Sequence, residues 1–152
     1  MFKTSLISAA LVCAPLAACA QDTSPEPAPE PAAQSAPFSP VIVASDTIFL
    51  AGHLGRLPGT RNYPDGGIGP QTTQTLENIG ATLATVDATH ADLVRCQVFL
   101  ADIADFAEMN AAYRKFFPAN PPARTTVAVS GLAANASIEI ECTGIVGHGD
   151  QN

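Results

Sequence analysis

Two short segments decide the fold: PPARTTV at residues 121–127 and SIEIEC at residues 137–142. The first passes from two prolines into β-branched residues, which is typical of a strand. The second alternates apolar and acidic residues with the period of a strand that is buried on one face. Its isoleucines and its cysteine therefore face a core, and its glutamates face the other way.

These two strands carry an arginine, Arg124, and a carboxylate, Glu139, in a chain with only seven Lys and Arg residues. A guanidinium matches a carboxylate in a bidentate way, and a nearby glutamate can hold a water against the bound molecule. This pattern favours a small-molecule site. A salt bridge between neighbouring strands is the other interpretation, and on these residues alone both stay open.

Hydrophobic periodicity along the chain predicts one α+β domain over residues 36–152, with helices on one face of a sheet. Helices are expected over residues 70–86 and from Asp102 or Asp105 through Phe116. Strands are expected over 41–44, 47–52, 93–100, 125–129 and 138–145. The stretch 54–69, rich in glycine and proline, is predicted to be a loop that includes one short strand at most.

The predicted strands have more apolar residues than one helical layer would cover, among them Val41, Val43, Ile48, Leu50, Val127 and Val129. An apolar sheet face without a covering layer indicates a subunit interface. We therefore expect a closed oligomer.

The N-terminus reads as a signal peptide over residues 1–18, with a basic start, a short apolar run and small residues before Cys19. The segment ending at Cys19 resembles a bacterial lipobox, which predicts lipidation of Cys19. Cleavage before Gln21 is the alternative. Residues 19–35, rich in proline and glutamate, are predicted to be an extended linker. We expect export to the bacterial cell envelope, the periplasm, with a lipid anchor or, alternatively, as a soluble or secreted protein.

The net charge of −7 argues against a nucleic-acid partner, since phosphate recognition needs clustered basic residues and only Arg114 and Lys115 are adjacent. No metal site is predicted, because His53, His90 and His148 are scattered and no CxxC motif occurs.

Cys96 and Cys142 both fall inside predicted strands. They could pair in an oxidising compartment, or they could be two small, buried apolar residues. The sequence favours the second interpretation.

From about Pro37 to Ile145, the chain resembles the RidA/YjgF family of reactive intermediate deaminases. The segments that carry the resemblance occur in the family's order and spacing: LENI at 76–79, VFLAD at 98–102, DF at 105–106, NAAY at 110–113, FF at 116–117, PARTTV at 122–127 and IEIE at 138–141. The resemblance implies a fold like that of chorismate mutase, a two-layer sandwich whose mixed sheet carries two helices on one face. It also implies a homotrimer with ligand clefts between subunits.

The activity implied by the resemblance is hydrolysis of enamine and imine intermediates to 2-oxo acids and ammonia, without a cofactor. Arg124 would hold the substrate carboxylate, and Glu139 would position the attacking water. The backbones of Gly52 and Thr126 would offer polar contacts in the pocket, with Asn110 nearby.

Two positions depart from the family pattern. Phe38, which we still expect to line the substrate pocket, stands where a tyrosine is usual, and Ala51 stands where a serine is common. Arg56 and Tyr63 are candidates to replace the missing hydroxyls. His53 follows Gly52 and either approaches the cleft or is a surface or interface residue without chemistry.

An exported domain is separated from the cytoplasmic enzymes that generate the family's known imines. The contrasting hypothesis is therefore a non-catalytic envelope protein that binds a small carboxylate, or a protein partner, through the same cleft.

Overall fold

The computed structural model describes residues 37–151. The predicted signal peptide at 1–18, the lipidation site Cys19 and the linker at 19–35 lie outside the described residues.

The described residues form a six-stranded sheet and two α-helices. The elements are β1 (Val41–Ala44), β2 (Thr47–Leu50), β3 (His53–Leu54), α1 (Ile68–Ala84), β4 (Leu93–Leu100), α2 (Phe106–Tyr113), β5 (Ala123–Ala128) and β6 (Ile138–Ile145). The strand order is β1-β2-β6-β4-β5, and β3 pairs with β6 beside β2. β4 and β5 run parallel and all other pairs are antiparallel, so the sheet is mixed.

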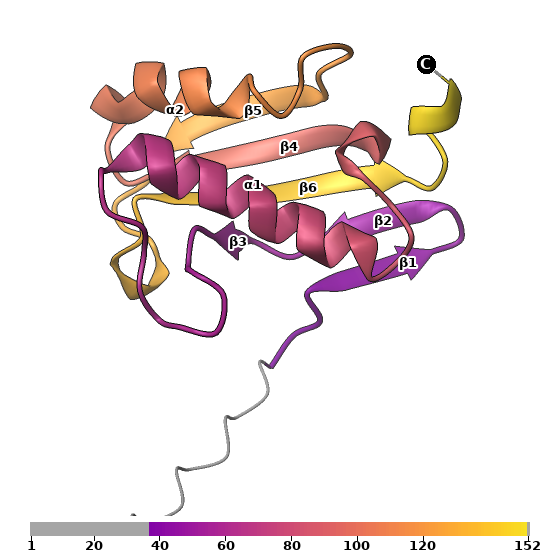
Figure 1. The fold of residues 1–152 in the computed structure, drawn as a ribbon, viewed down its shortest axis with the longest axis horizontal. Helices are drawn as coiled ribbons and strands as arrows, with labels where there is room; N and C mark the ends of the chain where they lie inside the picture. The colour runs from indigo at the N-terminus through magenta and orange to yellow at the C-terminus, as the bar shows by residue number, and fades with distance from the viewer. Residues whose placement is uncertain (1–36, 152) are drawn as a thin grey trace, which may run out of the picture. The chain divides into compact units, whose positions relative to one another are not determined.

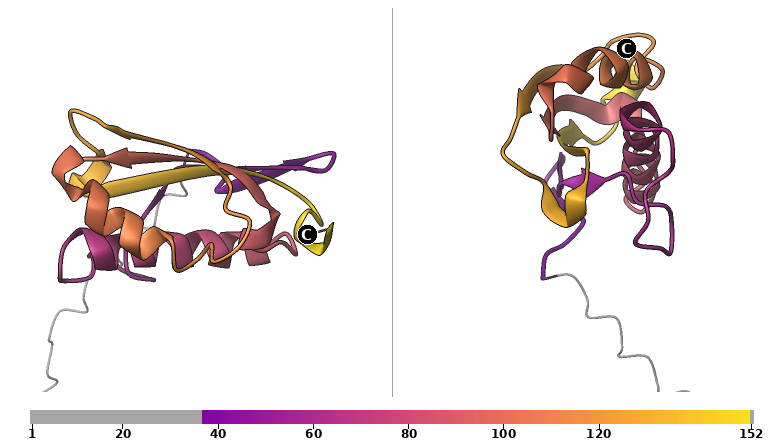
Figure 2. Two further views of the ribbon diagram at one scale, coloured as in Figure 1. Left: turned by 90° about the horizontal axis from the view of Figure 1, so that it is seen from above. Right: turned by 90° about the vertical axis from the view of Figure 1, so that its left-hand side faces the viewer.

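Both helices pack on the same face of the sheet, and the other face has no covering layer within the described part of the chain (Figure 1). Seen along the sheet, the helices form one layer and the strands the other (Figure 2). The predicted α+β sandwich is confirmed.

The predicted elements differ from the observed ones only at their ends. α1 begins at Ile68, so Pro70 lies in its first turn, where no intrahelical amide bond is lost. α2 ends at Tyr113 and not at Phe116, because the chain continues in turns toward Pro118. The one short strand allowed for in the stretch 54–69 is β3, which begins one residue before that stretch, at His53.

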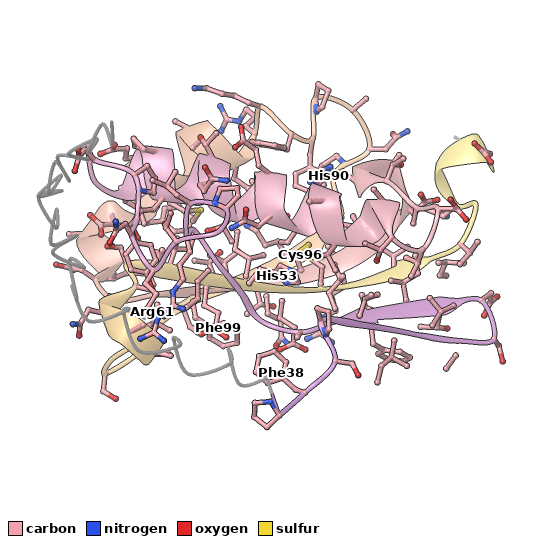
Figure 3. The ribbon with its side chains drawn as sticks, turned by 60° about the horizontal axis from the view of Figure 1, so that its bottom comes forward. Phe38, His53, Arg61, His90, Cys96 and Phe99 are labelled. Carbon is pink, nitrogen blue, oxygen red and sulfur yellow. A yellow bond between two sulfur atoms is a disulfide. The ribbon has the colours of Figure 1, made fainter. Side chains whose placement is uncertain are left out.

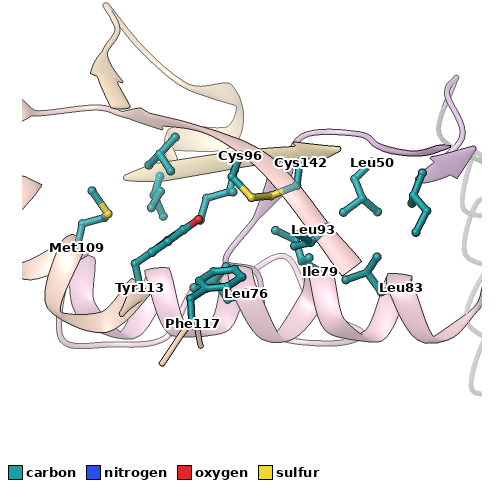
Figure 4. Packing of buried hydrophobic residues seen from close by; sticks show 14 of the residues in the cluster. Leu50, Leu76, Ile79, Leu83, Leu93, Cys96, Met109, Tyr113, Phe117 and Cys142 are labelled. Carbon is teal, nitrogen blue, oxygen red and sulfur yellow. A yellow bond between two sulfur atoms is a disulfide. The ribbon is translucent and has the colours of Figure 1, made fainter. Parts of the chain in front are cut away.

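The core lies between the helices and the inner face of the sheet. Ile79 and Leu83 of α1 and Ile138 and Ile140 of β6 are fully buried (0% exposed), while Glu139 between the two isoleucines is half-buried on the other face. The alternation expected from residues 138–142 is therefore confirmed. Figure 4 shows the apolar side chains of α1 and α2 beneath the strands.

Cys96 and Cys142 form a disulfide at the centre of this core, with an S–S distance of 2.06 Å (Figure 4). The prediction of two unlinked apolar residues is wrong. The register of β4 and β6 places the two cysteines directly opposite each other, with 4.1 Å between their Cα atoms, on the buried face. Sequence periodicity predicts the face of each strand but not the register between strands that are distant in the chain.

Candidate functional site

Arg124 lies on β5, and its side chain is held by α2. The Nη2 of Arg124 donates a hydrogen bond of 2.8 Å to Asn110 Oδ1. Its guanidinium carbon lies 4.6 Å from the centre of the Tyr113 ring and 6.0 Å from the centre of the Phe106 ring. The aromatic rings attract the cation and the amide orients it, so the guanidinium is held in place before any ligand arrives.

This arginine lines a cavity of about 320 Å³ at the edge of the sheet, together with Asn110, Tyr113, Arg114, Phe117, Pro121 and Pro122. Within residues 37–151, no carboxylate forms an ion pair with Arg124. The guanidinium therefore keeps donors available for an anion from outside the described chain.

The contact of Tyr113 and Phe106 with Arg124 was not predicted from the sequence. Burial raises the pKa of Tyr113 to about 12, with the charge of Arg124 opposing the shift. Its hydroxyl is buried without a hydrogen-bond partner among the described residues. Tyr113 therefore remains a neutral aromatic support for the guanidinium at physiological pH.

Thr126 lies two residues after Arg124 on β5, at the edge of the sheet. Val129, which directly follows β5, donates its backbone N–H to Leu100 O of β4 at 2.9 Å, so this N–H points toward β4. Consecutive residues of an edge strand direct their amides alternately toward the neighbour and away from it, so the Thr126 N–H points away from β4. Its Oγ1 is buried without a hydrogen-bond partner in the described structure. Arg124 and Thr126 thus provide donors on the same edge.

Glu139 lies on β6 and contacts Gly52, the residue just before β3. Glu139 is paired with Leu54 across these strands. A Cβ added to Gly52 would overlap Glu139 Oε1 and would lie 2.9 Å from its Cδ. Glycine at this position therefore lets the carboxylate rest directly over the backbone.

Beside Gly52 lies a shallow cavity of about 270 Å³, lined by Phe38, Pro40, Ala51, Gly52, His53, Leu54 and Arg56. The Phe38 ring is 61% exposed, and Figure 3 shows it close to the point where the described chain begins. The structure thus brings Phe38 and Gly52 together, and it places Arg56 with them. Tyr63 lies elsewhere, since its hydroxyl donates to Ala134 O at 3.3 Å.

The Arg124 cluster and the Glu139 cluster lie on opposite faces of the sheet. Arg124 is paired with the buried Cys96, so its side chain lies on the helix side of the sheet. Glu139 is paired with Phe99, and Phe99 is paired with Val127. All three side chains lie on the open face, the one without helices. β4 also separates β5 from β6. The salt bridge between neighbouring strands that was left open above is therefore wrong, and one protomer does not bring the two side chains together.

The open face carries apolar residues, and the expected Val127 is among them. Val41 pairs with Leu50 and Val43 with Ile48, so all four share the helix side, which corrects the expectation for these residues. On the open face, Ile42 is 56%, Phe49 49% and Val127 41% exposed. The half-buried Phe99 shares this face (Figure 3). The open face therefore carries apolar side chains that no helix covers within the described residues, as expected.

His53 links β3 to α1. Its Nδ1 donates to Ala51 O at 2.7 Å, and its Nε2 lies 2.8 Å from Thr82 Oγ1, whose hydroxyl donates to it when the ring is neutral. Burial lowers the pKa of His53, with the bond to Ala51 opposing the shift. His53 thus lines the cavity beside Gly52, and its two ring nitrogens are engaged with Ala51 and Thr82.

Acid should destabilise the fold through His53. Its pKa in the folded chain lies below the ordinary value of 6.5, so the unfolded chain takes up the proton first as the pH falls. The contribution to the free energy of unfolding is full above that value and declines below it. Urea unfolding at about pH 7.5 and about pH 5 should show a larger loss for the wild type than for His53→Gln, which does not titrate. Equal losses would contradict the assignment.

The described residues contain neither a candidate metal site nor a candidate membrane-spanning helix. Between residues 37 and 151, no group of three or more His, Cys, Asp or Glu side chains could hold a metal ion. In the same part of the chain, no helix is long and apolar enough to cross a membrane.

The described structure is that of a small α+β sandwich protein. Its Arg124 guanidinium is held in place at the edge strand of a mixed sheet. Comparison with known proteins agrees: residues 27–146 match the family model described as endoribonuclease L-PSP. The solved YjgF gene product of E. coli superposes with a TM-score of 0.69 at 31% identity, over 73% of this chain and 89% of that one.

The most similar relatives include two deaminases. The chloroplastic Reactive Intermediate Deaminase A of Arabidopsis thaliana is 42% identical over 106 residues, which is 70% of this chain and 57% of that protein. The human 2-iminobutanoate/2-iminopropanoate deaminase is 33% identical over 111 residues, which is 73% of this chain and 81% of that protein. The chain belongs to the RidA/YjgF family of deaminase-like proteins.

Proposed function

We propose that this protein hydrolyses the imines of 2-amino acids, and their enamine tautomers, to 2-oxo acids and ammonia. Water adds to the imine carbon, the carbon–nitrogen bond of the resulting carbinolamine breaks, and ammonia leaves as the carbonyl forms. The observation that carries the proposal is the orientation of Arg124, which Asn110 and Tyr113 hold at a cavity with no internal carboxylate. The 2-carboxylate that substrate and product share matches this guanidinium.

The proposed site lies in a cleft between subunits. Arg124 and Glu139 are on opposite faces of one protomer's sheet, so a site that uses both needs residues from two protomers. The uncovered apolar residues Ile42, Phe49 and Val127 supply a face for such an assembly. We propose a homotrimer, and the molar mass from light scattering tests it.

In this site, Arg124 and the outward N–H of Thr126 bind the carboxylate. Glu139, whose carboxylate lies over Gly52, accepts a hydrogen bond from the attacking water and then takes its proton. The same carboxylate can return the proton to the departing nitrogen. Phe38 lines the pocket beside them. Such proton transfer contributes about 10²- to 10⁴-fold in rate, and orientation of water and imine supplies the rest. No cofactor is part of the proposal.

The direct test is ammonia release from freshly generated 2-iminopropanoate by the purified protein. We expect acceleration above the spontaneous rate with no added metal or cofactor. Binding of 2-oxobutanoate in calorimetry without any acceleration would instead favour the non-catalytic carboxylate-binding protein. The net charge of −7 gives a nucleic acid little electrostatic attraction as the main ligand.

We also propose that the protein is exported to the cell envelope and anchored by lipid on Cys19. The sequence before residue 20 motivates this proposal, and the Cys96–Cys142 disulfide supports it, since such bonds persist in oxidising compartments. Metabolic labelling with a fatty acid should mark the wild type and not Cys19→Ala. An unlabelled wild type that begins at Gln21 would mean ordinary secretion.

A further inference from the structure

Arg56 is a second candidate anion-binding arginine, and it lines the cavity beside Gly52. Its Nε is buried without a hydrogen bond, and no ion pair to Arg56 occurs between residues 37 and 151. Burying a guanidinium nitrogen costs free energy unless an acceptor meets it. The donors of Arg56 are therefore available to a group that the described chain does not supply.

The backbone around Arg56 is held rigidly. Asn78 of α1 donates from Nδ2 to Leu54 O and to Arg56 O, each at 2.9 Å. These two bonds tie the segment after β3 to the helix. Arg56 is thus presented by a supported backbone and not by a free loop, which lowers the entropy lost when its side chain engages a ligand.

The rest of the cavity offers little polarity. Phe38, Pro40, Ala51 and Leu54 contribute apolar surface, and the ring nitrogens of His53 are engaged with Ala51 and Thr82. The side chains that line this cavity therefore carry one charge that is free to act, the cation of Arg56. Such a lining fits a ligand with an anionic substituent.

Arg56 is also close to the proposed water. Leu54, two residues before it, is paired with Glu139, and Gly52 on the other side of Leu54 underlies the Glu139 carboxylate. A substrate whose imine carbon faces the water on Glu139 would direct its side chain into this cavity.

We propose that Arg56 binds a second carboxylate, so that the preferred substrates are imines of dicarboxylic amino acids, such as 2-iminosuccinate and 2-iminoglutarate. The inference rests on the proposed imine hydrolysis. Arg124 holds the carboxylate next to the imine carbon, and Arg56 holds the carboxylate of the side chain. The reaction is unchanged: water adds to the imine carbon, ammonia leaves, and a dicarboxylic 2-oxo acid forms.

The test compares substrates with one and two carboxylates on matched variants of the full protein. Arg56→Leu should reduce kcat/KM for 2-iminosuccinate about 10- to 100-fold and change that for 2-iminopropanoate less than about threefold. Arg56→Lys should recover part of the loss, because it keeps the charge without the planar fork. Arg61→Leu is the control, since Arg61 is an exposed arginine of the same loop that does not line the cavity (Figure 3). It should behave as the wild type.

Equal losses of Arg56→Leu on both substrates would overturn the proposal, as would a wild type that does not favour the dicarboxylic imine. A changed oligomeric mass of Arg56→Leu would place Arg56 in a subunit contact and would also overturn it. If the wild type hydrolyses neither imine, the proposed function fails. Calorimetry with 2-oxo acids then tests separately whether Arg56 binds a second carboxylate. Tighter binding of 2-oxoglutarate than of 2-oxobutanoate, lost in Arg56→Leu, supports the second carboxylate site, and equal affinities contradict it.

Discussion

Mixing two inactive variants, Arg124→Ala and Glu139→Gln, should restore imine hydrolysis. The two side chains lie on opposite faces of one protomer's sheet, so each proposed site takes its arginine from one subunit and its glutamate from another. When equal amounts of the variants are unfolded together and reassembled, about a quarter of the sites should receive both native residues. The mixture should therefore regain about a quarter of wild-type activity, measured as ammonia release.

The two variants should fail in different ways when assayed alone. Arg124→Ala should lose carboxylate affinity and turnover together, about 100-fold in kcat/KM, since the carboxylate is bound in the ground state and the transition state alike. Glu139→Gln should keep most of the affinity for 2-oxobutanoate and lose about 10²- to 10⁴-fold in kcat. Arg124→Lys should recover little, because an ammonium cannot reproduce the fork held between Asn110 and Tyr113.

The control for Glu139 is Glu141→Gln, since Glu141 lies on the same face of the same strand, two residues further along. It should keep activity within about threefold of the wild type. A mixture that stays inactive while both variants form normal oligomers would contradict the shared site. Full activity of Arg124→Ala alone would remove Arg124 from the mechanism.

Removing the disulfide should produce the largest loss of stability. Cys96 and Cys142 are 46 residues apart in sequence, and closing a loop of this length restricts the unfolded chain by about 4 kcal/mol. Urea unfolding of the double variant Cys96→Ala/Cys142→Ala should show a decrease of this order in the free energy of unfolding. Part of the decrease would come from the small cavity that two lost sulfur atoms leave in the core.

The wild type with its disulfide reduced separates these contributions, since it keeps both sulfur atoms and loses only the link. Its free energy of unfolding should lie between those of the oxidised wild type and the double variant. If denatured, unreduced protein reacts with two equivalents of a thiol reagent at these positions, the link is absent. An unchanged stability after complete reduction would show that the loop closure contributes nothing.

Local pattern was sufficient for most of the secondary structure. The alternation over residues 138–142 predicted which side of β6 is buried, and hydrophobic periodicity predicted the helix over residues 70–86 that is observed as α1. The strand predicted over residues 125–129 is present as β5, which begins two residues earlier, at Ala123. These are properties of short segments, which the periods of a strand and a helix determine without reference to the rest of the chain.

The candidate site was predictable only as a set of residues. The resemblance to the RidA/YjgF family identified Arg124, Glu139, Gly52 and Asn110, and the family was confirmed. Their arrangement was not predictable from periodicity. In one protomer, Arg124 joins Asn110, while Glu139 joins Gly52 on the other side of the sheet. Hydrophobic periodicity also could not predict that Tyr113 contacts Arg124 or that Arg56 lies beside Gly52.

Short segments of the sequence were thus enough to predict most of the elements, the buried face of β6 and the family. Only the tertiary structure decided that Cys96 is bonded to Cys142, that Val41 and Val43 share the helix side, and that the two proposed catalytic side chains lie on opposite faces. The physical reason is register. Which residues of two strands lie opposite each other depends on hydrogen bonds and packing between segments far apart in the chain, and a shift of one residue would move each side chain to the other face.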